Sequence, residues 1–551
     1  MKRLLMLLAA GLFVAPGVFP QDLFDLVKTG TPGQVREALA RGADIQDRDA
    51  EGMTPLMWAA LRNPDPEIIT TLLESGARVD DRDAHGTTAL MWAAMGNPSP
   101  KIITTLLENG AKVDDRNNDG LTSFMWAAMS NRNPKIIAAL LENGAKVDDR
   151  NEGGLTPLMW AAMGNPNPEI ITTLLENGAR VDDRDGRGTA AAMWAAMRNQ
   201  NPEIIRTLLE SGAGVDDRNE YGTTALMWAA EFNPNLRIIT TLLENGARVD
   251  DRNKSGVTAL MQAAGSNPNP EIITTLLENG ARIEDRDEQG TTALMWAAMG
   301  NHDPEILSTL LEKGAKVDDR DEHGTTALMW AAKANSNPEI MTTLLKNGAK
   351  IDGRIFIELL KTGTPEQVRI AISNGAKVGG RSKAGWTPLM YAAESNPDPG
   401  VIMTLLENGA AISDRDKNGR TSLMLAASGN RNPDVIATLV KNGAKVNDRD
   451  KNGVVPLMWA AMRNPNPDVV TTLAKSGAML DGRDANGRTA LMWAAVANRN
   501  PEVILALLET GANPEIRSNE GQTAFDYAKY NTRLRGTDAY LELYELIKSR
   551  F

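Results

Sequence analysis

The side chains that could carry acid–base or nucleophilic chemistry are few in this chain of 551 residues. It has no cysteine and only three histidines, His85, His302 and His323. The histidines share no pattern with a neighbouring serine and carboxylate, and no nucleophile motif precedes them. The absence of cysteine excludes disulfides, thiolate nucleophiles and metals bound by thiolates. The sequence therefore predicts a protein that is not an enzyme and has no catalytic residue.

Two acidic segments suggest calcium binding. Residues 414–419 and 448–453 both read Asp-Arg-Asp-Lys-Asn-Gly, which begins like the calcium-binding loop of an EF-hand. That loop needs a glutamate with two ligand oxygens at its twelfth position. The twelfth residues here are Leu425 and Trp459, so the ligand set is incomplete. We therefore predict no metal site and no cofactor, with weak calcium binding between stacked acidic turns as the alternative.

An arginine flanked by aspartate or asparagine recurs every 34 residues in each of two stretches of the chain. One interpretation is a ladder of cations that binds anions. The other is a ladder of Arg–Asp pairs that holds neighbouring turns in register. We favour the second because the arginine is present in nearly every repeat. The column consists of Arg48, Arg82, Arg116, Arg150, Arg184, Arg218, Arg252, Arg286, Arg320, Arg415, Arg449, Arg483 and Arg517.

The same period of 34 residues governs most of the chain, and tryptophan marks it best. Tryptophan stands at positions 58, 92, 126, 160, 194 and 228, and again at 296 and 330. Gln262 fills the position between these two groups. After a slip the period resumes at Tyr391, and tryptophan returns at 459 and 493. Such repeats indicate a solenoid, in which short units stack and cover one another's apolar faces.

Residues 149–182 show the elements of one unit. A first short helix is predicted for Thr-Pro-Leu-Met-Trp-Ala-Ala-Met, and the segment Asn-Pro-Asn-Pro ends it. Asn167 is a suitable N-cap for a second helix, and Pro168 is a suitable first residue. Gly178 suits the left-handed position after the second helix, before an extended turn. The apolar residues of the second helix share one face: Ile170, Ile171, Leu174 and Leu175.

These segments resemble ankyrin repeats, whose pattern runs T-P-L-H-x-A-A, then G-H, then G-A-x-V-N. The resemblance spans roughly residues 21–551. It implies an all-α repeat solenoid of helix–turn–helix units with a β-hairpin or finger loop between units, about fourteen full repeats with caps. Methionine, as at Met57 and Met159, replaces the family histidine and so removes a side-chain bond, and Asn-Pro-x-Pro replaces the Gly-His turn. The resemblance also implies that Trp92 and its equivalents are buried between units, where the family has an inward leucine.

The two ends of the chain differ from the repeats. Lys2 and Arg3 precede an apolar run at residues 4–14, so residues 1–20 are predicted to be a bacterial-type signal peptide. The run is too short for an ordinary membrane-spanning helix. Export to the periplasm or secretion follows from this prediction. The last residues predict a C-terminal cap with an amphipathic final helix.

The period slips once inside the chain. Trp330 and Tyr391 are 61 residues apart, seven fewer than two full periods. We predict one array at residues 21–351, with an N-terminal cap, and a second at residues 381–551. A truncated, cap-like unit at residues 352–380 joins them, and it lacks a finger tip and the start of a helix near Arg354. Continuous stacking is favoured over two arrays that bend at a flexible joint.

Composition and resemblance together suggest what binds. The formal net charge of −12 disfavours nucleic acid and anionic membrane. The resemblance implies a scaffold that binds a protein through its concave groove and finger tips. We predict a monomer, without stable membrane insertion once the signal is removed, because no other segment is apolar enough to span a membrane. A structural spacer or stabiliser of a cell-envelope component is the alternative. The candidate contact residues, taken where repeats differ, are Arg198, Tyr221, Glu231, Phe232, Gln262, Ser266, His323 and Lys333.

Overall fold

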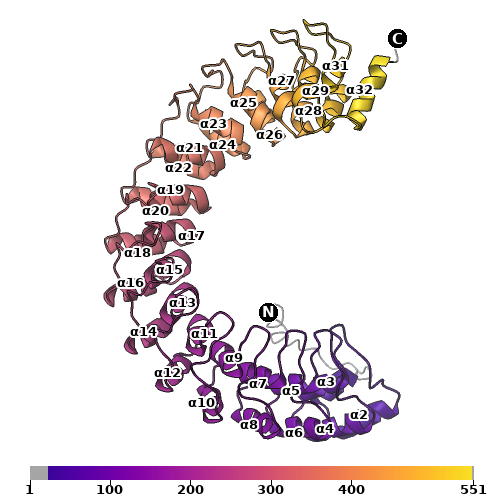
Figure 1. Cartoon of the computed structure of the whole chain (residues 1–551), viewed down its shortest axis with the longest axis vertical. Coiled ribbons are helices and arrows are strands. Elements are labelled where there is room, and N and C mark those ends of the chain that lie inside the picture. The colour runs from indigo at the N-terminus through magenta and orange to yellow at the C-terminus, as the bar shows by residue number, and fades with distance from the viewer. Residues whose placement is uncertain (1–22, 549–551) are drawn as a thin grey trace. The chain divides into compact units, whose positions relative to one another are not determined.

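The computed structural model describes residues 23–548, and the predicted signal peptide at residues 1–20 lies outside them. The described chain folds into 32 α-helices and an isolated β-bridge between Arg184 and Ala190. Within residues 23–548 it divides into two compact units, residues 23–259 with 278–281, and residues 260–277 with 282–548. The fold is an all-α repeat of helix pairs, as predicted (Figure 1). No helix in the described chain combines the length and apolar composition needed to cross a membrane.

The helices have the following bounds: α1 Leu23–Thr29, α2 Pro32–Ala40, α3 Pro55–Arg62, α4 Pro66–Glu74, α5 Ala89–Gly96, α6 Pro100–Glu108, α7 Ser123–Ser130, α8 Pro134–Glu142, α9 Pro157–Gly164, α10 Pro168–Glu176, α11 Ala191–Arg198, α12 Pro202–Glu210, α13 Ala225–Phe232, α14 Leu236–Glu244, α15 Ala259–Ser266, α16 Pro270–Glu278, α17 Ala293–Gly300, α18 Pro304–Glu312, α19 Ala327–Ala334, α20 Pro338–Lys346, α21 Gly353–Thr362, α22 Pro365–Ser373, α23 Pro388–Ser395, α24 Pro399–Glu407, α25 Ser422–Gly429, α26 Pro433–Lys441, α27 Pro456–Arg463, α28 Pro467–Lys475, α29 Ala490–Ala497, α30 Glu502–Glu509, α31 Ala524–Ala528 and α32 Asp538–Lys548.

The pair α9 and α10 shows why the repeated sequence folds in this way. Thr156 caps α9, and the Asn167 side chain accepts the backbone N–H of Glu169 at 3.1 Å to cap α10. Ile170 and Leu174 are fully buried, whereas Leu175 is only partly buried. The second helices are therefore attached by one narrow apolar stripe.

The first asparagine of each Asn-Pro-x-Pro turn donates hydrogen bonds to the preceding helix pair. Asn165 is fully buried, and its Nδ2 donates to the carbonyl oxygens of Ala128 at 2.9 Å and Asn131 at 2.8 Å. Its Oδ1 accepts the N–H of Asn167 at 3.0 Å. We call this column the asparagine ladder. The same three bonds recur at Asn97, Asn131, Asn199, Asn301, Asn335, Asn430, Asn464 and Asn498.

Methionine takes over part of the role that the resemblance gives to histidine. The Thr54 N–H donates to the sulfur of Met57 at 3.4 Å, and the same bond joins Thr387 to Met390 at 3.4 Å. The expected loss of a side-chain bond is therefore wrong in these units, because the thioether is a weak acceptor at the helix start.

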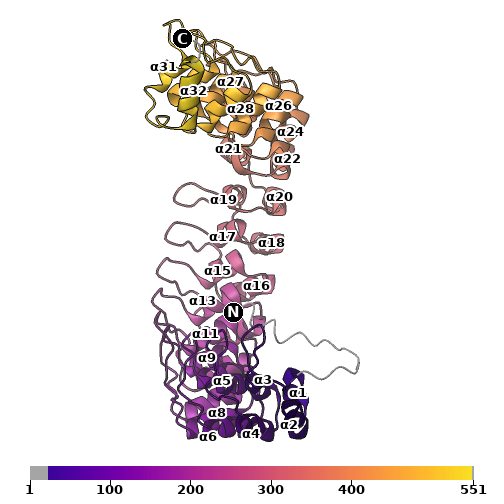
Figure 2. The same ribbon diagram turned by 90° about the vertical axis from the view of Figure 1, so that its right-hand side faces the viewer.

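The slip in the period removes a finger, by which we mean the loop between the second helix of one unit and the first helix of the next. Residues 313–326 form the finger between α18 and α19, whereas only residues 347–352 join α20 to α21. Figure 2 shows loops that protrude beside α17 and α19 but none between α20 and α21. The predicted loss of the helix start near Arg354 is wrong, because α21 begins at Gly353 with Asp352 as its N-cap.

Stacking continues through the place where the finger is missing. The Gln367 side chain replaces the ladder asparagine there, and its Nε2 donates to the carbonyl oxygen of Asn335 at 2.9 Å. On the other side of the joint, Asn396 Nδ2 donates to the carbonyl oxygen of Leu360 at 3.2 Å. The helix pair α21 and α22 is thus bonded to both of its neighbours within the second unit.

Candidate functional site

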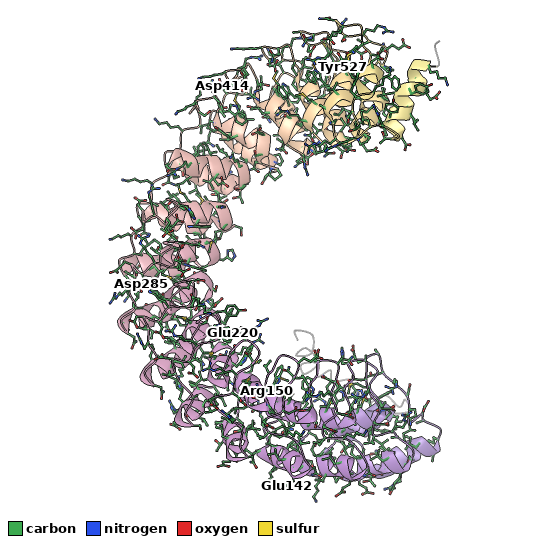
Figure 3. All side chains as sticks on the ribbon, in the orientation of Figure 1. Glu142, Arg150, Glu220, Asp285, Asp414 and Tyr527 are labelled. Carbon is green, nitrogen blue, oxygen red and sulfur yellow. The ribbon has the colours of Figure 1, made fainter. Side chains whose placement is uncertain are left out.

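The odd-numbered helices and the fingers of the first unit lie on one side of the helix stack, and the even-numbered helices lie on the other (Figure 1). We call the first side the inner face. Figure 3 shows the two sides by their labelled residues, with Arg150 on a finger and Glu142 at the end of an outer helix. In α9, Leu158 and Met159 are buried between helices, and so are Ala161 and Ala162.

The tryptophan of each first helix lies on the inner face. Trp92 and Trp126 are buried, with 9% and 7% of their surface exposed. The others in the column are partly exposed, so the predicted burial is complete for these two rings and partial for the rest. The reason is that the leucine, methionine and alanines around each tryptophan already fill the space between helices. The partly exposed members are Trp58, Trp160, Trp194, Trp228, Trp296, Trp330, Trp459 and Trp493.

A carboxylate on the finger fixes the indole. Trp92 Nε1 donates to Asp83 Oδ2 at 3.0 Å, while Asp83 Oδ1 accepts the backbone N–H groups of His85 and Thr87, both at 2.8 Å. One aspartate therefore shapes the finger and orients the ring. The same indole–carboxylate bond joins Trp58 to Asp49, Trp194 to Asp185, Trp296 to Asp287, Trp330 to Asp321, Trp459 to Asp450 and Trp493 to Asp484.

Where asparagine replaces this aspartate, a donor is left over. Asn117 Oδ1 accepts the N–H groups of Asp119 at 3.1 Å and Leu121 at 2.8 Å, so the amide has no second oxygen for the indole. The buried Nε1 atoms of Trp126 and Trp160 accordingly find no hydrogen-bond partner among the described residues. These two rings are oriented by packing alone.

This difference gives a first prediction. Replacing Asn117 with aspartate supplies the missing acceptor, so we expect Asn117→Asp to raise the free energy of unfolding by about 1 kcal/mol. The reverse change, Asp83→Asn, orphans the Trp92 N–H and is expected to lower it by about 1–2 kcal/mol. Urea unfolding followed by tryptophan fluorescence measures both. If Asn117→Asp instead lowers the free energy of unfolding, the missing indole bond does not limit the stability of this repeat.

Methionines pack beside the indoles on the inner face of the first unit. Met95, Met129 and Trp160 are partly buried and pack against a cluster that contains Met125 and Trp126. Further along, the rings of Trp194 and Trp228 meet edge to face, with centroids 5.5 Å apart. We call this the Trp–Met strip: Trp92, Met95, Trp126, Met129, Trp160, Met163, Trp194, Met197 and Trp228.

The predicted contact residues of the first unit lie in two consecutive repeats, on α11, on α13 and at the finger tip between α12 and α13. Tyr221, at a finger tip, is 57% exposed, and Phe232, at the end of α13, is 49% exposed. Arg198 is exposed at the equivalent end of α11. Glu231 is partly buried beside Phe232, and burial raises the pKa of its carboxyl above the usual value.

The predicted contact residues of the second unit lie on α15, on α19 and at one finger tip. Gln262 is partly buried and Ser266 is exposed, both on α15. His323 is exposed at a finger tip, and Lys333 is exposed on α19, where its ammonium lies 5.5 Å from the centre of the Trp330 ring. These residues do not form a cluster, and their role as contacts stays a prediction.

The arginine column is structural, as predicted. Arg150 Nη1 donates to the carbonyl oxygens of Gly154 and Arg184, both at 2.8 Å, and its Nη2 pairs with Asp183 at 2.8 Å. Arg381, which the sequence did not reveal because it follows the slip, makes the same bonds and pairs with Asp414 (labelled in Figure 3) at 2.6 Å. Because these guanidinium groups already bond to carbonyl and carboxylate groups of the fingers, they are not arranged to bind anions.

The histidines and acidic turns are not gathered into one place. His85 lies 3.8 Å from Glu51 across two exposed finger tips, and His302 Nδ1 lies 3.2 Å from Asn335 Oδ1. Asp416 Oδ1 accepts the N–H groups of Asn418 and Arg420, which is the geometry of a finger turn. In the part of the chain that the structure describes, no three acidic or histidine side chains are grouped to hold a metal ion.

Comparison with known proteins agrees with the helix pairs and fingers. The model of the family "Ankyrin repeats (3 copies)" matches residues 23–117, 99–185, 158–253, 192–287, 260–355, 357–450, 430–519 and 457–537. These matches identify ankyrin repeats and no catalytic domain, and ankyrin repeats typically mediate interactions between proteins. The search of curated proteins gives no match. Because the family matches run almost without interruption from residue 23 to residue 537, the chain belongs to the ankyrin-repeat family.

Proposed function

We propose that the chain is a non-enzymatic scaffold that binds a protein partner on the inner face of its first unit, through the Trp–Met strip and the finger tips. The observation that carries the proposal is the partly exposed indole held by a finger carboxylate, as in Trp194, whose Nε1 donates to Asp185 Oδ2 at 3.2 Å. A partly exposed tryptophan in a fixed orientation offers a large contact area at little cost in side-chain entropy. Methionine beside it adapts to the partner's shape.

Local shape and charge support the same face. A small cavity of about 40 Å³ is lined by Trp92, Met95 and Trp126 between two fingers, which suits a single apolar side chain of a partner. Residues 23–259 carry 24 lysines and arginines against 34 aspartates and glutamates, whereas residues 260–551 are nearly balanced, with 33 against 36. We therefore propose a partner whose contact surface has an apolar centre and a basic rim.

We further propose that the protein works outside the cytoplasm, in the periplasm or as a secreted protein, and as a monomer. The support for export is the composition of residues 1–20, with two cations before an apolar run. An acidic, apolar-centred groove without chemistry of its own fits a scaffold in that compartment.

The test uses the full chain as bait for proteins from an envelope extract, followed by affinity measurement with each captured protein. Tyr221→Ser and Phe232→Ser change exposed side chains, so they leave the fold intact, and together we expect them to weaken binding at least tenfold. Glu176→Ser, on the outer side of α10, is the matched control and should have no effect. If all three variants bind the captured proteins equally well, the inner face is not the binding surface, and a role as a structural spacer is favoured.

A further inference from the structure

Neighbouring fingers are joined by a regular set of bonds. In the second unit the backbone N–H of Glu322 donates to the carbonyl oxygen of Gln289 at 3.1 Å, from one finger to the tip before it. The Arg286 side chain bonds to the following finger: its Nη1 donates to the carbonyl oxygen of Arg320, and its Nη2 pairs with Asp319, both at 2.8 Å. Beyond the joint the same set of bonds resumes, with the backbone N–H of Lys417 donating to the carbonyl oxygen of Ala384 at 3.2 Å.

The set of bonds is interrupted where the finger between α20 and α21 is missing. Arg320 donates only to the carbonyl oxygen of its own Gly324, at 2.7 Å, and pairs with no carboxylate in residues 23–548. The carbonyl oxygen of His323 accepts no hydrogen bond there, and the backbone N–H of Lys383 donates none. The finger before the joint and the finger after it thus each present one unused edge.

An apolar pocket lies at this interruption. It has a volume of about 360 Å³, and its lining includes Phe356, Leu360, Trp386 and Tyr391. The rings of Trp386 and Tyr391 are 5.0 Å apart. Trp386 is the one tryptophan that departs from the 34-residue period, and it occupies a position that is threonine, valine or another smaller residue in most units. The pocket therefore combines an extra aromatic ring with the space a finger leaves.

The border of the pocket is cationic, in contrast to the acidic chain. Lys377 and Arg381 line it, with Asp352 as the one acidic residue of the lining. Lys377 and Lys383 form no ion pair with any described residue, and Lys383 is exposed. Arg320, on the finger before the joint, likewise pairs with no carboxylate among residues 23–548, so the two fingers that flank the interruption and the pocket lining each supply a cation. Such charges favour an acidic ligand.

We propose that this site, which we call the finger vacancy, binds an extended acidic segment of another polypeptide, about seven residues long. The segment takes the place of the absent finger: an N–H donates to His323 and a carbonyl accepts from Lys383, as in strand addition to an open edge. Its carboxylates pair with Arg320, Lys377 and Lys383, and one aromatic or leucine side chain enters the pocket. The finger vacancy is independent of the inner face of the first unit.

The probe is a fluorescein-labelled peptide of seven residues, Asp-Glu-Asp-Phe-Asp-Glu-Asp, added to the full chain. We expect saturable binding by fluorescence anisotropy, at least tenfold stronger than for the matched peptide with lysine at each acidic position. A version methylated at its backbone nitrogens should bind at least fivefold more weakly. Absence of binding, or equal binding by the lysine peptide, overturns the proposal.

Variants locate the site. Lys383→Glu reverses an exposed charge at the vacancy and should weaken peptide binding at least tenfold. Lys417→Glu makes the same change one unit later, where the finger bonds are complete, and should have no effect. Phe232→Ser, in the first unit, should leave peptide binding unchanged, so the two sites can fail separately. If Lys383→Glu and Lys417→Glu weaken peptide binding equally, the loss reflects the overall charge of the protein, and the proposed site is wrong.

Discussion

Asn165→Ala is expected to lower the free energy of unfolding of the first unit by about 3–5 kcal/mol. The change removes two bonds to the carbonyl oxygens of Ala128 and Asn131 and one from the N–H of Asn167. Asn165 is fully buried, so water does not replace them, and each orphaned group costs roughly 1–2 kcal/mol. Because coupling between repeats passes from neighbour to neighbour, the defect should also broaden the transition.

Urea unfolding of the full chain, followed by circular dichroism, measures the effect. Asn167→Ala is the comparison, because Asn167 is only partly buried, caps α10 and donates a single bond to the preceding repeat, at the carbonyl oxygen of Arg132, so its loss should cost about 1–2 kcal/mol. Asn165→Asp tests the donor alone, since a carboxylate has the same shape but cannot donate to two carbonyl groups. A loss no larger than that of Asn167→Ala would contradict the asparagine ladder as the main link between units.

The second large effect separates two methionines on α7. Met125 is 1% exposed within the apolar cluster, whereas Met129, four residues later, is partly buried at its edge. Truncation of a fully buried methionine costs about 2–5 kcal/mol, so Met125→Ala should destabilise the unit by that amount. Met129→Ala should cost less than about 1 kcal/mol, because its side chain already meets solvent.

Binding should respond in the opposite order. If the Trp–Met strip holds the partner, Met129→Ala weakens capture several-fold, while Met125→Ala leaves affinity unchanged under conditions where the unit stays folded. Thermal unfolding and surface plasmon resonance with a captured partner give the two readings. Equal effects of both variants on affinity would indicate that binding responds to stability alone.

Much of the fold could be predicted because its causes are local and repeated. Helix ends are set by threonine and asparagine caps and by proline and glycine, which the sequence shows directly. The Arg–Asp pairs could be predicted from opposite charges at a fixed spacing. Arg381 was missed, although it makes the same bonds, because the slip of seven residues takes it out of the period.

The asparagine ladder and the position of tryptophan depend on a neighbouring unit, and local patterns do not show which atoms that unit presents. Nevertheless the chain carries one signal for the tryptophan. A carboxylate or hydroxyl stands nine residues before most of the rings: Asp83 before Trp92, and Ser518 before Tyr527, whose hydroxyl donates to Ser518 Oγ at 3.2 Å (Tyr527 is labelled in Figure 3). A polar finger residue at a fixed spacing before the ring indicates that the ring lies beside the finger, on the inner face.

The asparagine ladder also gives the array a direction of growth. Each ladder amide donates to carbonyl groups of the unit before it, as Asn165 does to Ala128 and Asn131. A chain made from its N-terminus therefore finds the acceptors for each new unit already folded. Among the ladder bonds, loss of repeats from the C-terminal end exposes carbonyl groups, whereas loss from the N-terminal end exposes amide donors. The finger arginines have the opposite direction, since each donates to the following repeat. Within each unit, assembly can follow synthesis one repeat at a time.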